Sequence, residues 1–268
     1  MVPEGLTPLV DSGGFLFSAC AAVESHTDNP QLQDAIDVLE RRLTEVAVAI
    51  KSAEDPVFCF GAKLNFRFKL SKSREYKPNR QPKPHLYTAL EAYVKATYPY
   101  AVRQCVEDDD TMAMLSDGKT NIIVSVDKDL AQVNGYYFKP EIWNSGSYGP
   151  VLVSDAMSFI QPKDPDKIGK GLKGIGYKFF WAQVIMGDTV DGISGLPKHG
   201  PKFAYDLLAD LPSEHACYEA VKGAYQDVLL NADECLREQV DLLYMIRELD
   251  GGGMPIMYTY PINPEEKV

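Results

Sequence analysis

The order of hydrophobic and polar positions predicts strands that alternate with helices through the first half of the chain. Short apolar runs bounded by turn-forming residues predict buried strands, and apolar residues that recur every three or four positions predict helices. The predicted strands are Pro8–Asp11, Pro56–Phe60, Tyr100–Val106 and Asn121–Val126, and the predicted helices are Phe15–Glu24, 31–51, 85–97 and Glu107–Leu115. This alternation is typical of an α/β fold, with a mostly parallel central sheet and helices on both faces.

The second half of the chain has a different pattern. An irregular stretch rich in Gly, Pro and Lys is followed by helical periodicity that a Gly- and Pro-rich loop interrupts. In order, these are the irregular residues 139–174, a helix over 176–187, a loop over 188–202, a mostly helical stretch over 203–248 and a short strand near Tyr258. We therefore expect a core over residues 1–175 and a helical region over 176–268.

The composition narrows the class of protein. Hydrophobic residues make up 45% and charged residues 24% of the chain, which is ordinary for a globular protein. The longest aliphatic runs are far shorter than the roughly 20 residues that span a membrane, and the first residues lack the features of a signal peptide. The five cysteines are too widely spaced for a metal knuckle. We expect a cytoplasmic protein with reduced thiols and no contact with membranes.

Charge is unevenly distributed along the chain. The formal net charge of −11 argues at first against a nucleic-acid ligand. Residues 63–83, however, hold eight basic residues and one acidic residue, interleaved with aromatic residues and prolines. Since this segment has no apolar stripe, we expect a basic arch or loop that is exposed and mobile. Phosphate groups would suit it, although a solvated surface is the simpler alternative.

Acidic residues follow the carboxyl ends of three predicted strands. Asp11 ends the first strand, the acids from Glu107 to Asp110 follow the third, and Asp127 and Asp129 follow the fourth. In a parallel sheet these ends lie along one edge, where ligands bind. Converging carboxylates repel one another unless cations compensate them, and oxygen ligands suit Mg²⁺ or Mn²⁺. Two such ions can clamp the oxygens of a phosphoryl displacement, so phosphodiester chemistry is indicated.

A further acidic pair, Asp188 and Asp191, would share one face if its backbone were helical. Each acidic group also has a local structural explanation. The acids of 107–110 suit a helix N-terminus, those of 127–129 suit a surface turn, and those of 188–191 suit a helix cap. Their joint occurrence at successive strand ends favours a metal site.

Several segments together resemble the flap endonuclease family of 5′-nucleases, closest to the bacteriophage 5′→3′ exonucleases. They are residues 121–130 (NIIVSVDKDL), 187–195 (GDTVDGISG), an arch-like motif at 76–80 (YKPNR) and an acidic motif at 106–110 (VEDDD). The resemblance runs in family order from Asp11 to about residue 210. It implies a monomeric, metal-dependent 5′→3′ exonuclease and flap endonuclease with a two-metal mechanism. The implied substrates are branched or 5′-ended DNA and RNA–DNA hybrids, and the implied setting is a phage protein in the host bacterial cytoplasm.

The resemblance also implies which acids hold two Mg²⁺ or Mn²⁺ ions. The ligands of the first ion would be Asp11, Glu107, Asp109 and Asp127, with Asp110 nearby. The ligands of the second ion would be Asp127, Asp129, Asp188 and Asp191. Asp108 stands at the family's variable position and is expected to be a spectator.

Other residues correspond to the family's DNA contacts. Lys77 would reach the scissile phosphate from the arch and Arg80 would contact the backbone, while Tyr76 would stack on a base. Arg67 falls at its expected place in the same segment.

The resemblance further implies a helix–three-turn–helix over residues 176–210, which holds duplex DNA. In the family its glycine-rich turns approach phosphate and a potassium ion. Gly195, Gly200 and Lys202 match this pattern. Lys198 and His199 stand where the family prefers a glycine and an aliphatic residue, and Lys198 is expected to contact phosphate directly.

One position departs from the family pattern. The second strand would end in an aspartate, but Ala62 stands there. The alanine is an introduced change, a natural residue with water in the coordination gap, or a sign of lost catalysis. We expect impaired cleavage, because charge stabilisation supplies most of this catalysis. Two other functions stay open, a PIN-type ribonuclease with the same acidic edge and a non-catalytic protein that binds branched DNA.

Overall fold

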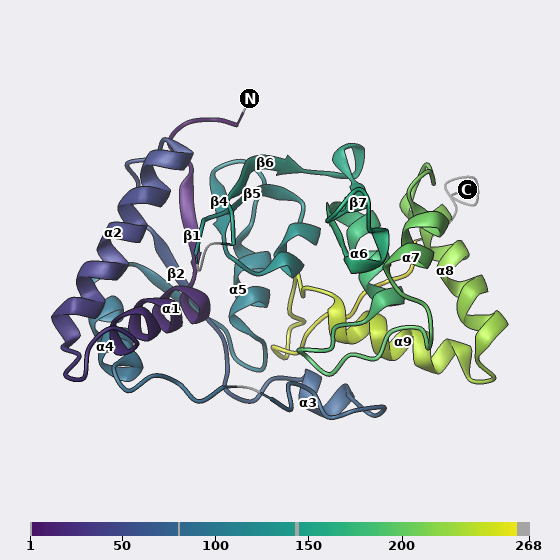
Figure 1. Cartoon of the computed structure of the whole chain (residues 1–268), viewed down its shortest axis with the longest axis horizontal. Helices are drawn as coiled ribbons and strands as arrows, with labels where there is room; N and C mark the ends of the chain where they lie inside the picture. The colour runs from purple at the N-terminus through teal and green to yellow at the C-terminus, as the bar shows by residue number, and fades with distance from the viewer. Residues whose placement is uncertain (1, 80, 143–144, 262–268) are drawn as a thin grey trace. The chain divides into compact units, whose positions relative to one another are not determined.

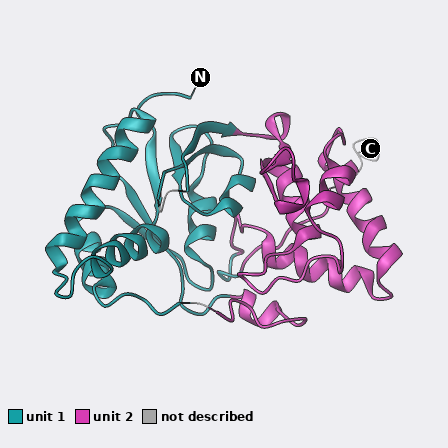
Figure 2. Ribbon diagram, in the orientation of Figure 1, with its two compact units in different colours: residues 1–65, 81–152, 251–254 teal, residues 66–80, 153–250, 255–268 magenta. Residues whose placement is uncertain are grey.

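The computed structural model describes residues 2–79, 81–142 and 145–261. The chain divides into two compact units (Figure 2). The first comprises residues 1–65, 81–152 and 251–254, and the second comprises residues 66–80, 153–250 and 255–268. The division differs from the boundary expected at residue 175, because residues 153–175 and most of the basic segment group with the helical region.

A six-stranded sheet forms the centre of the first unit, in the order β3-β2-β1-β4-β5-β6 (Figure 1). Its strands are β1 (Thr7–Asp11), β2 (Val57–Phe60), β3 (Tyr100–Val102), β4 (Asn121–Val124), β5 (Gly135–Lys139) and β6 (Tyr148–Val153). The pairs β1–β2, β1–β4, β2–β3 and β4–β5 are parallel. The mostly parallel sheet expected from the sequence is confirmed.

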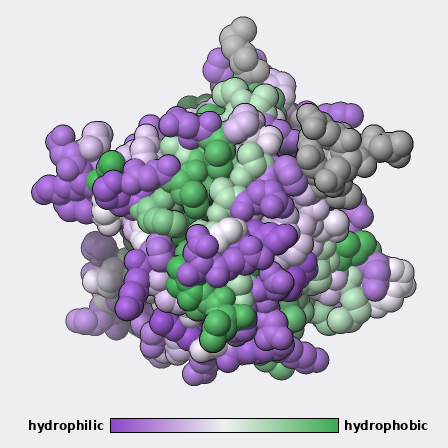
Figure 3. Space-filling model, turned by 90° about the vertical axis from the view of Figure 1, so that its right-hand side faces the viewer, coloured by the Kyte–Doolittle hydropathy of each residue, from purple (hydrophilic) through white to green (hydrophobic). Residues whose placement is uncertain are grey.

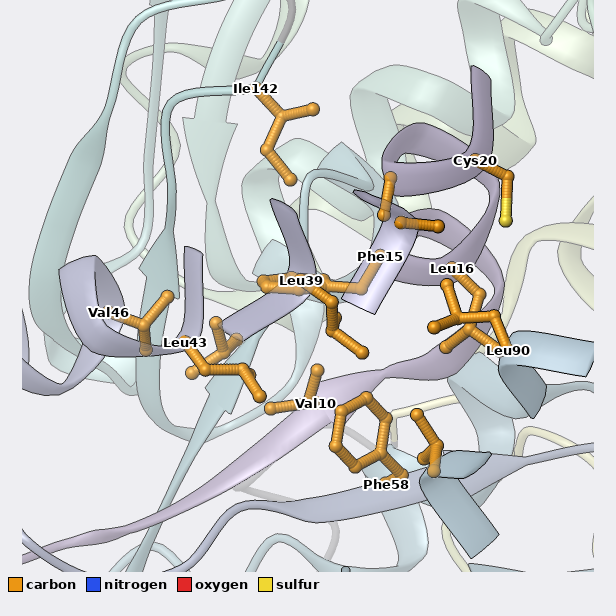
Figure 4. Close-up of a cluster of buried hydrophobic side chains, with 14 of the residues drawn as sticks. Val10, Phe15, Leu16, Cys20, Leu39, Leu43, Val46, Phe58, Leu90 and Ile142 are labelled. Atoms are coloured by element: carbon orange, nitrogen blue, oxygen red, sulfur yellow. The ribbon is translucent and has the colours of Figure 1, made fainter. Parts of the chain in front are cut away.

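Helices cover both faces of this sheet. On one face α1 (Ser12–Glu24), α2 (Leu32–Ile50) and α4 (Tyr87–Thr97) pack against one another, while α5 (Asp108–Leu115) contacts β1, β2 and β3. Val10 and Phe58 lie in the core with Phe15 and Leu39 (Figure 4). Successive side chains of a strand alternate between faces, so the equally buried Leu9 lies on the face opposite Val10. Burial on both faces explains why the strands are continuous apolar runs.

The region expected to be irregular contains three strands. Besides β6, residues 139–174 hold β7 (Phe159–Pro162) and most of β8 (Leu172–Ile175), which pair antiparallel. Their Gly and Pro residues obscured the alternation. A short strand was also expected near Tyr258. The described residues there form no strand, so this prediction is wrong.

Helices make up most of the second unit. They are the short α3 (Arg67–Leu70), α6 (Gly176–Met186), α7 (Pro201–Leu208), α8 (Glu214–Val228) and α9 (Ala232–Leu243). Trp181 of α6 is fully buried, and Tyr225 of α8 donates a hydrogen bond of 2.7 Å to the carbonyl of Val184. The side of the molecule seen in Figure 3 is mostly hydrophilic around a smaller hydrophobic area. None of the helices in the described part of the chain is long and apolar enough to cross a membrane.

Candidate functional site

Asp11 stands at the carboxyl end of β1, where α1 begins. Its Oδ1 accepts a hydrogen bond of 2.9 Å from the N–H of Gly14, and its Oδ2 accepts one of 2.9 Å from the hydroxyl of Ser125. The residue is 5% exposed. Burial raises the pKa of Asp11 to about 7, and the charges of Asp108 and Asp127 add to this rise, while the two hydrogen bonds oppose it. An ionised Asp11 is therefore costly at neutral pH unless a positive charge is close.

Ser125 connects Asp11 to the end of β4. Its oxygen donates to Asp11 and accepts a hydrogen bond of 2.9 Å from the N–H of Asp127. The Asp127 carboxylate accepts one of 2.8 Å from the N–H of Asp129. The hydroxyl of buried Tyr137 donates to the Asp127 carbonyl at 3.1 Å. Burial, followed by the charges of Asp127 and Asp129, raises the pKa of Tyr137, so this hydroxyl remains a donor.

The acidic residues 107–110 form the beginning of α5. Glu107 is the N-cap, and its N–H donates a hydrogen bond of 3.0 Å to Oδ2 of Asp110. Both side chains are buried, while Asp108 and Asp109 are half-buried. The local explanation, a helix N-terminus, is thus confirmed for Glu107 and Asp110. Asp108 also stands in the first turn of α5, but its carboxylate has neighbours outside this helix.

Asp108 lies over the first turn of α1. A Cβ on Gly13 would be 2.5 Å from Oδ2 of Asp108 and 3.4 Å from Oδ1 of Asp11, and one on Gly14 would be 2.6 Å from Oδ2 of Asp11. The two glycines therefore leave the space that the carboxylates occupy. Asp108, expected to be a spectator, contributes more than any other charged residue to the raised pKa of Asp11.

The chemistry of this edge fits a divalent cation. Burial, followed by the charges of Asp108, Asp11 and Asp109, also raises the pKa of the Cys59 thiol, so several acids act on the same small region. Carboxylate oxygens are the ligands that Mg²⁺ and Mn²⁺ prefer. Within the described ranges, no three His, Cys, Asp or Glu side chains are already gathered as a ligand set. The donor types and the cost of ionising Asp11 fit such an ion, while the present side-chain positions do not form its coordination shell.

Asp188 and Asp191 belong to the second unit and lie on a tight turn rather than a helical face. The backbones of Asp188 and Ile193 exchange hydrogen bonds of 2.9 and 2.7 Å, and Oδ1 of Asp188 accepts one of 2.9 Å from the N–H of Val190. The side chain of Asp188 is buried. The capping explanation is therefore wrong, because no helix begins at these residues and Asp188 instead closes a turn.

Lys77 contacts this turn. Its Nζ lies 3.8 Å from Oδ2 of Asp191, and its N–H donates a hydrogen bond of 2.9 Å to the Asp191 carbonyl. Lys77 has φ of +51°, which is uncommon for a residue with a side chain. A Cβ on Gly192 would overlap the carbonyl oxygen of Glu75, so glycine is needed where the two segments meet. The structure thus brings together two residues that the sequence assigned to the same chemistry.

Two residues of the basic segment, Arg67 and Tyr76, are buried, whereas Lys63, Lys69, Lys72, Arg74 and Lys83 are exposed. Arg67 is fully buried, and its Nε and Nη2 donate hydrogen bonds of 3.0 and 2.7 Å to the carbonyls of Leu242 and Tyr244. Tyr76 is 4% exposed and packs edge to face on Phe68, with ring centroids 5.4 Å apart. The expectation of an exposed segment holds for most of its basic residues, but Arg67 and Tyr76 are buried rather than free to contact DNA. Arg67 holds the segment to residues 242–244, and the ring of Tyr76 is covered.

Arg80 lies outside the described residues, so its expected contact with the DNA backbone stays a prediction.

The expected helix–three-turn–helix residues divide into two kinds. Gly195 is buried, has φ of +64° and donates its N–H to Oε1 of Gln239 at 2.9 Å, so it supports the turn from inside. Lys198 is exposed, and Lys202 is exposed and paired with Asp206. Gly200 is the N-cap of α7, and among the described residues no atom lies within 4 Å of where its Cβ would be. Lys198 and Lys202 are therefore exposed cations on either side of the N-cap of α7 in the sequence.

The structure of the chain was compared with solved structures, and its sequence with protein-family models. No protein-family model matches the sequence. The bacteriophage T5 D15 protein co-crystallised with metal ions matches with a TM-score of 0.51 and 14% identity, over 89% of this chain and 99% of that chain. The T5 5′-exonuclease with bound zinc matches with a TM-score of 0.52 and 15% identity, over the same shares. The T5 D15 flap endonuclease in a complex with DNA and metal ions gives 0.50 and 16%, over 88% and 98%.

The chain has the 5′-nuclease fold. At these identities the likeness concerns the fold alone, and at that level it confirms the resemblance noted in the sequence. Sequence reasoning missed Ser125, which links two strand ends, and did not anticipate that Asp108 lies beside Asp11. Gly13 and Gly14, two and three residues after Asp11, were a signal for the position of Asp108, because residues without a side chain beside a carboxylate leave room for another group.

Proposed function

We propose that this protein is a metal-dependent 5′-nuclease, a 5′→3′ exonuclease and flap endonuclease acting on DNA and on RNA–DNA hybrids. The observation that carries the proposal is the burial of Asp11 at a sheet edge beside Asp108 and Asp127. Grouping buried acids costs stability, and a divalent cation would offset that cost. Solved structures with the same fold include complexes with metal ions and DNA, which supports the proposed class of cofactor and substrate.

The carboxylates of the first unit would hold Mg²⁺ or Mn²⁺. When bound, the ions supply an activated water and stabilise charge on the phosphoryl group. Asp11 and Asp127 are the acids whose positions are fixed most directly, because Ser125 orients both strand ends. Glu107, Asp109 and Asp110 would complete the first site. Asp129, Asp188 and Asp191 are the proposed ligands of a second ion.

The basic residues would bind the substrate. Lys77 would place its charge at the scissile phosphate, with Arg80 on the adjoining backbone. Lys198 and Lys202 suit the phosphates of a duplex, and the nearby N-terminus of α7 has no side-chain cap. A potassium ion near Gly200, a monomeric state and a phage origin in a bacterial cytoplasm complete the proposal.

Cleavage of a 5′-flap DNA tests this function. The substrate is incubated with Mg²⁺, with Mn²⁺ and with chelator, using the natural sequence, Asp11→Asn and the control Asp55→Asn. Asp55 is an exposed acid just before the opposite, amino end of β2. We expect metal-dependent products with 5′-phosphates, a loss of at least about a hundredfold in Asp11→Asn, and no change in Asp55→Asn. A preference for single-stranded RNA would instead indicate a PIN-type ribonuclease.

A non-catalytic protein that binds branched DNA is the second candidate, because Ala62 leaves the end of β2 without an acid. Binding of the flap with no cleavage in either metal, in both the natural chain and Ala62→Asp, would favour it. Cleavage that Ala62→Asp increases would identify an impaired nuclease.

A further inference from the structure

Three neighbouring strands of the sheet end differently. β1 ends in Asp11 and β4 is followed by Asp127, whereas β2, which pairs with β1, is followed by Gly61 and Ala62. β1 and β4 therefore each place an acid at this edge of the sheet, and β2 does not. A carboxylate in this place must come from another part of the first unit.

The beginning of α5 is held against the end of β2. The N–H of Ala62 donates a hydrogen bond of 2.7 Å to the carbonyl of Val106, and the hydroxyl of Thr111 donates one of 3.0 Å to the carbonyl of Phe60. A Cβ on Gly61 would overlap the backbone of Glu107 and of the next residue. The close approach therefore requires glycine at this position.

This approach places Asp108 beside Asp11. Oδ2 of Asp108 and Oδ1 of Asp11 lie 2.5 and 3.4 Å from the same point, the place of a Cβ on Gly13, so they are less than about 6 Å apart. Two oxygens that bind one Mg²⁺ at about 2.1 Å each are at most about 4 Å apart. The bound set by these two distances includes such a separation, so the arrangement is compatible with one ion shared by the two carboxylates.

We propose that Asp108 takes the place of the acid that β2 does not supply and is a ligand of the divalent cation. The inference rests on the proposed function, since it assumes a metal ion at this edge. Asp108 reaches the site from α5 because Gly61 allows the close approach of the backbone and Gly13 leaves room for the carboxylate. A purely structural role for Asp108, as an acid in the first turn of α5, predicts a loss of stability and unchanged metal binding.

Calorimetric titration of the metal-free protein with Mn²⁺ tests the proposal without relying on activity. The variants are Asp108→Asn, the double variant Ala62→Asp/Asp108→Asn, Asp11→Asn and the control Asp55→Asn. We expect Asp108→Asn to weaken Mn²⁺ binding at least about tenfold, and the double variant to recover most of that loss. The control should bind as the natural chain does. Urea unfolding in chelator should show Asp108→Asn to be at least as stable as the natural chain.

The variants distinguish failure of this inference from failure of the proposed function. Unchanged Mn²⁺ affinity in Asp108→Asn, with weakened binding in Asp11→Asn, would overturn the inference and leave the metal site intact. Unchanged affinity in both variants would overturn the two together. A loss that Ala62→Asp does not recover would overturn the claim that Asp108 replaces an acid of β2.

Discussion

The Ser125 hydroxyl oxygen lies 2.9 Å from Oδ2 of Asp11 and donates its proton to that carboxylate. The same oxygen accepts the N–H of Asp127. A single side chain thus fixes the ends of two parallel strands at the edge where the acids meet. The hydrogen bond favours the ionised form of Asp11 and so opposes the effect of burial on its pKa.

Replacing Ser125 with Ala should raise the pKa of Asp11 above about 7 and weaken metal binding several-fold at neutral pH. The ionised carboxylate loses a donor, and a metal ion competes with a more tightly held proton. Mn²⁺ titrations between pH 6 and 8 measure the effect. Ser25→Ala is the control, since the Ser25 hydroxyl donates to Ala22 on an exposed turn. An unchanged pH profile in Ser125→Ala would contradict this assignment.

The stability of the metal-free protein should depend on pH through Asp11. Because folding raises the pKa of this acid from 3.8 to about 7, the folded state holds a proton that the unfolded state has released between these values. The free energy of unfolding should therefore fall as pH rises from 4 to 7, by about 1.4 kcal/mol per pH unit at most. Above pH 7 this contribution should be lost completely.

Urea unfolding in chelator at pH 5 and pH 8 measures this dependence, with Asp11→Asn as the reference. The variant should lose less stability over this range than the natural chain does, because the asparagine does not ionise. Equal losses in the two proteins would show that Asp11 is ionised already at pH 5.

Arg67→Ala should destabilise the protein by about 3 kcal/mol. The substitution removes a fully buried side chain and leaves the buried carbonyl of Leu242 and the half-buried carbonyl of Tyr244 without this donor. Thermal and urea unfolding measure the effect, with the exposed neighbour Lys69→Ala as the control. A stable Arg67→Ala protein with weakened DNA binding would instead support the DNA contact first expected for this residue.

The combined substitution of Lys198 and Lys202 with Ala should reduce the salt dependence of DNA binding. Each lysine that neutralises a phosphate contributes about one to the slope of log affinity against log salt concentration, so the slope should fall by about two. Affinity for a 5′-flap DNA measured across salt concentrations tests this, with exposed Lys119→Ala as the control. An unchanged slope would show that this surface does not contact phosphates.

Much of the sheet could be predicted from the sequence, because strands buried on both faces are continuous apolar runs such as Asn121–Val126. The strands in residues 139–174 could not, because Gly149, Pro150 and Gly174 interrupt their pattern. Local sequence carries little information about strands whose pairing depends on segments elsewhere in the chain.

Local sequence also predicted only part of the candidate site. Asp11 and Asp127 were predictable because each follows a clear strand. The burial of Arg67 was not, because its partners lie about 175 residues further along the chain. The position of Asp108 depends on the absence of side chains at Gly61 and Gly13, which brings separate segments together. Long-range contacts of this kind leave no local periodicity.

The acidic edge formed by the ends of β1 and β4 is the proposed binding site for the divalent cations of a nuclease. An anomalous difference map from crystals grown with Mn²⁺ tests it most directly. We expect a strong peak at this edge, within bonding distance of carboxylate oxygens of Asp11 and Asp108. Mn²⁺ bound only elsewhere in the molecule, with this edge empty, would contradict it.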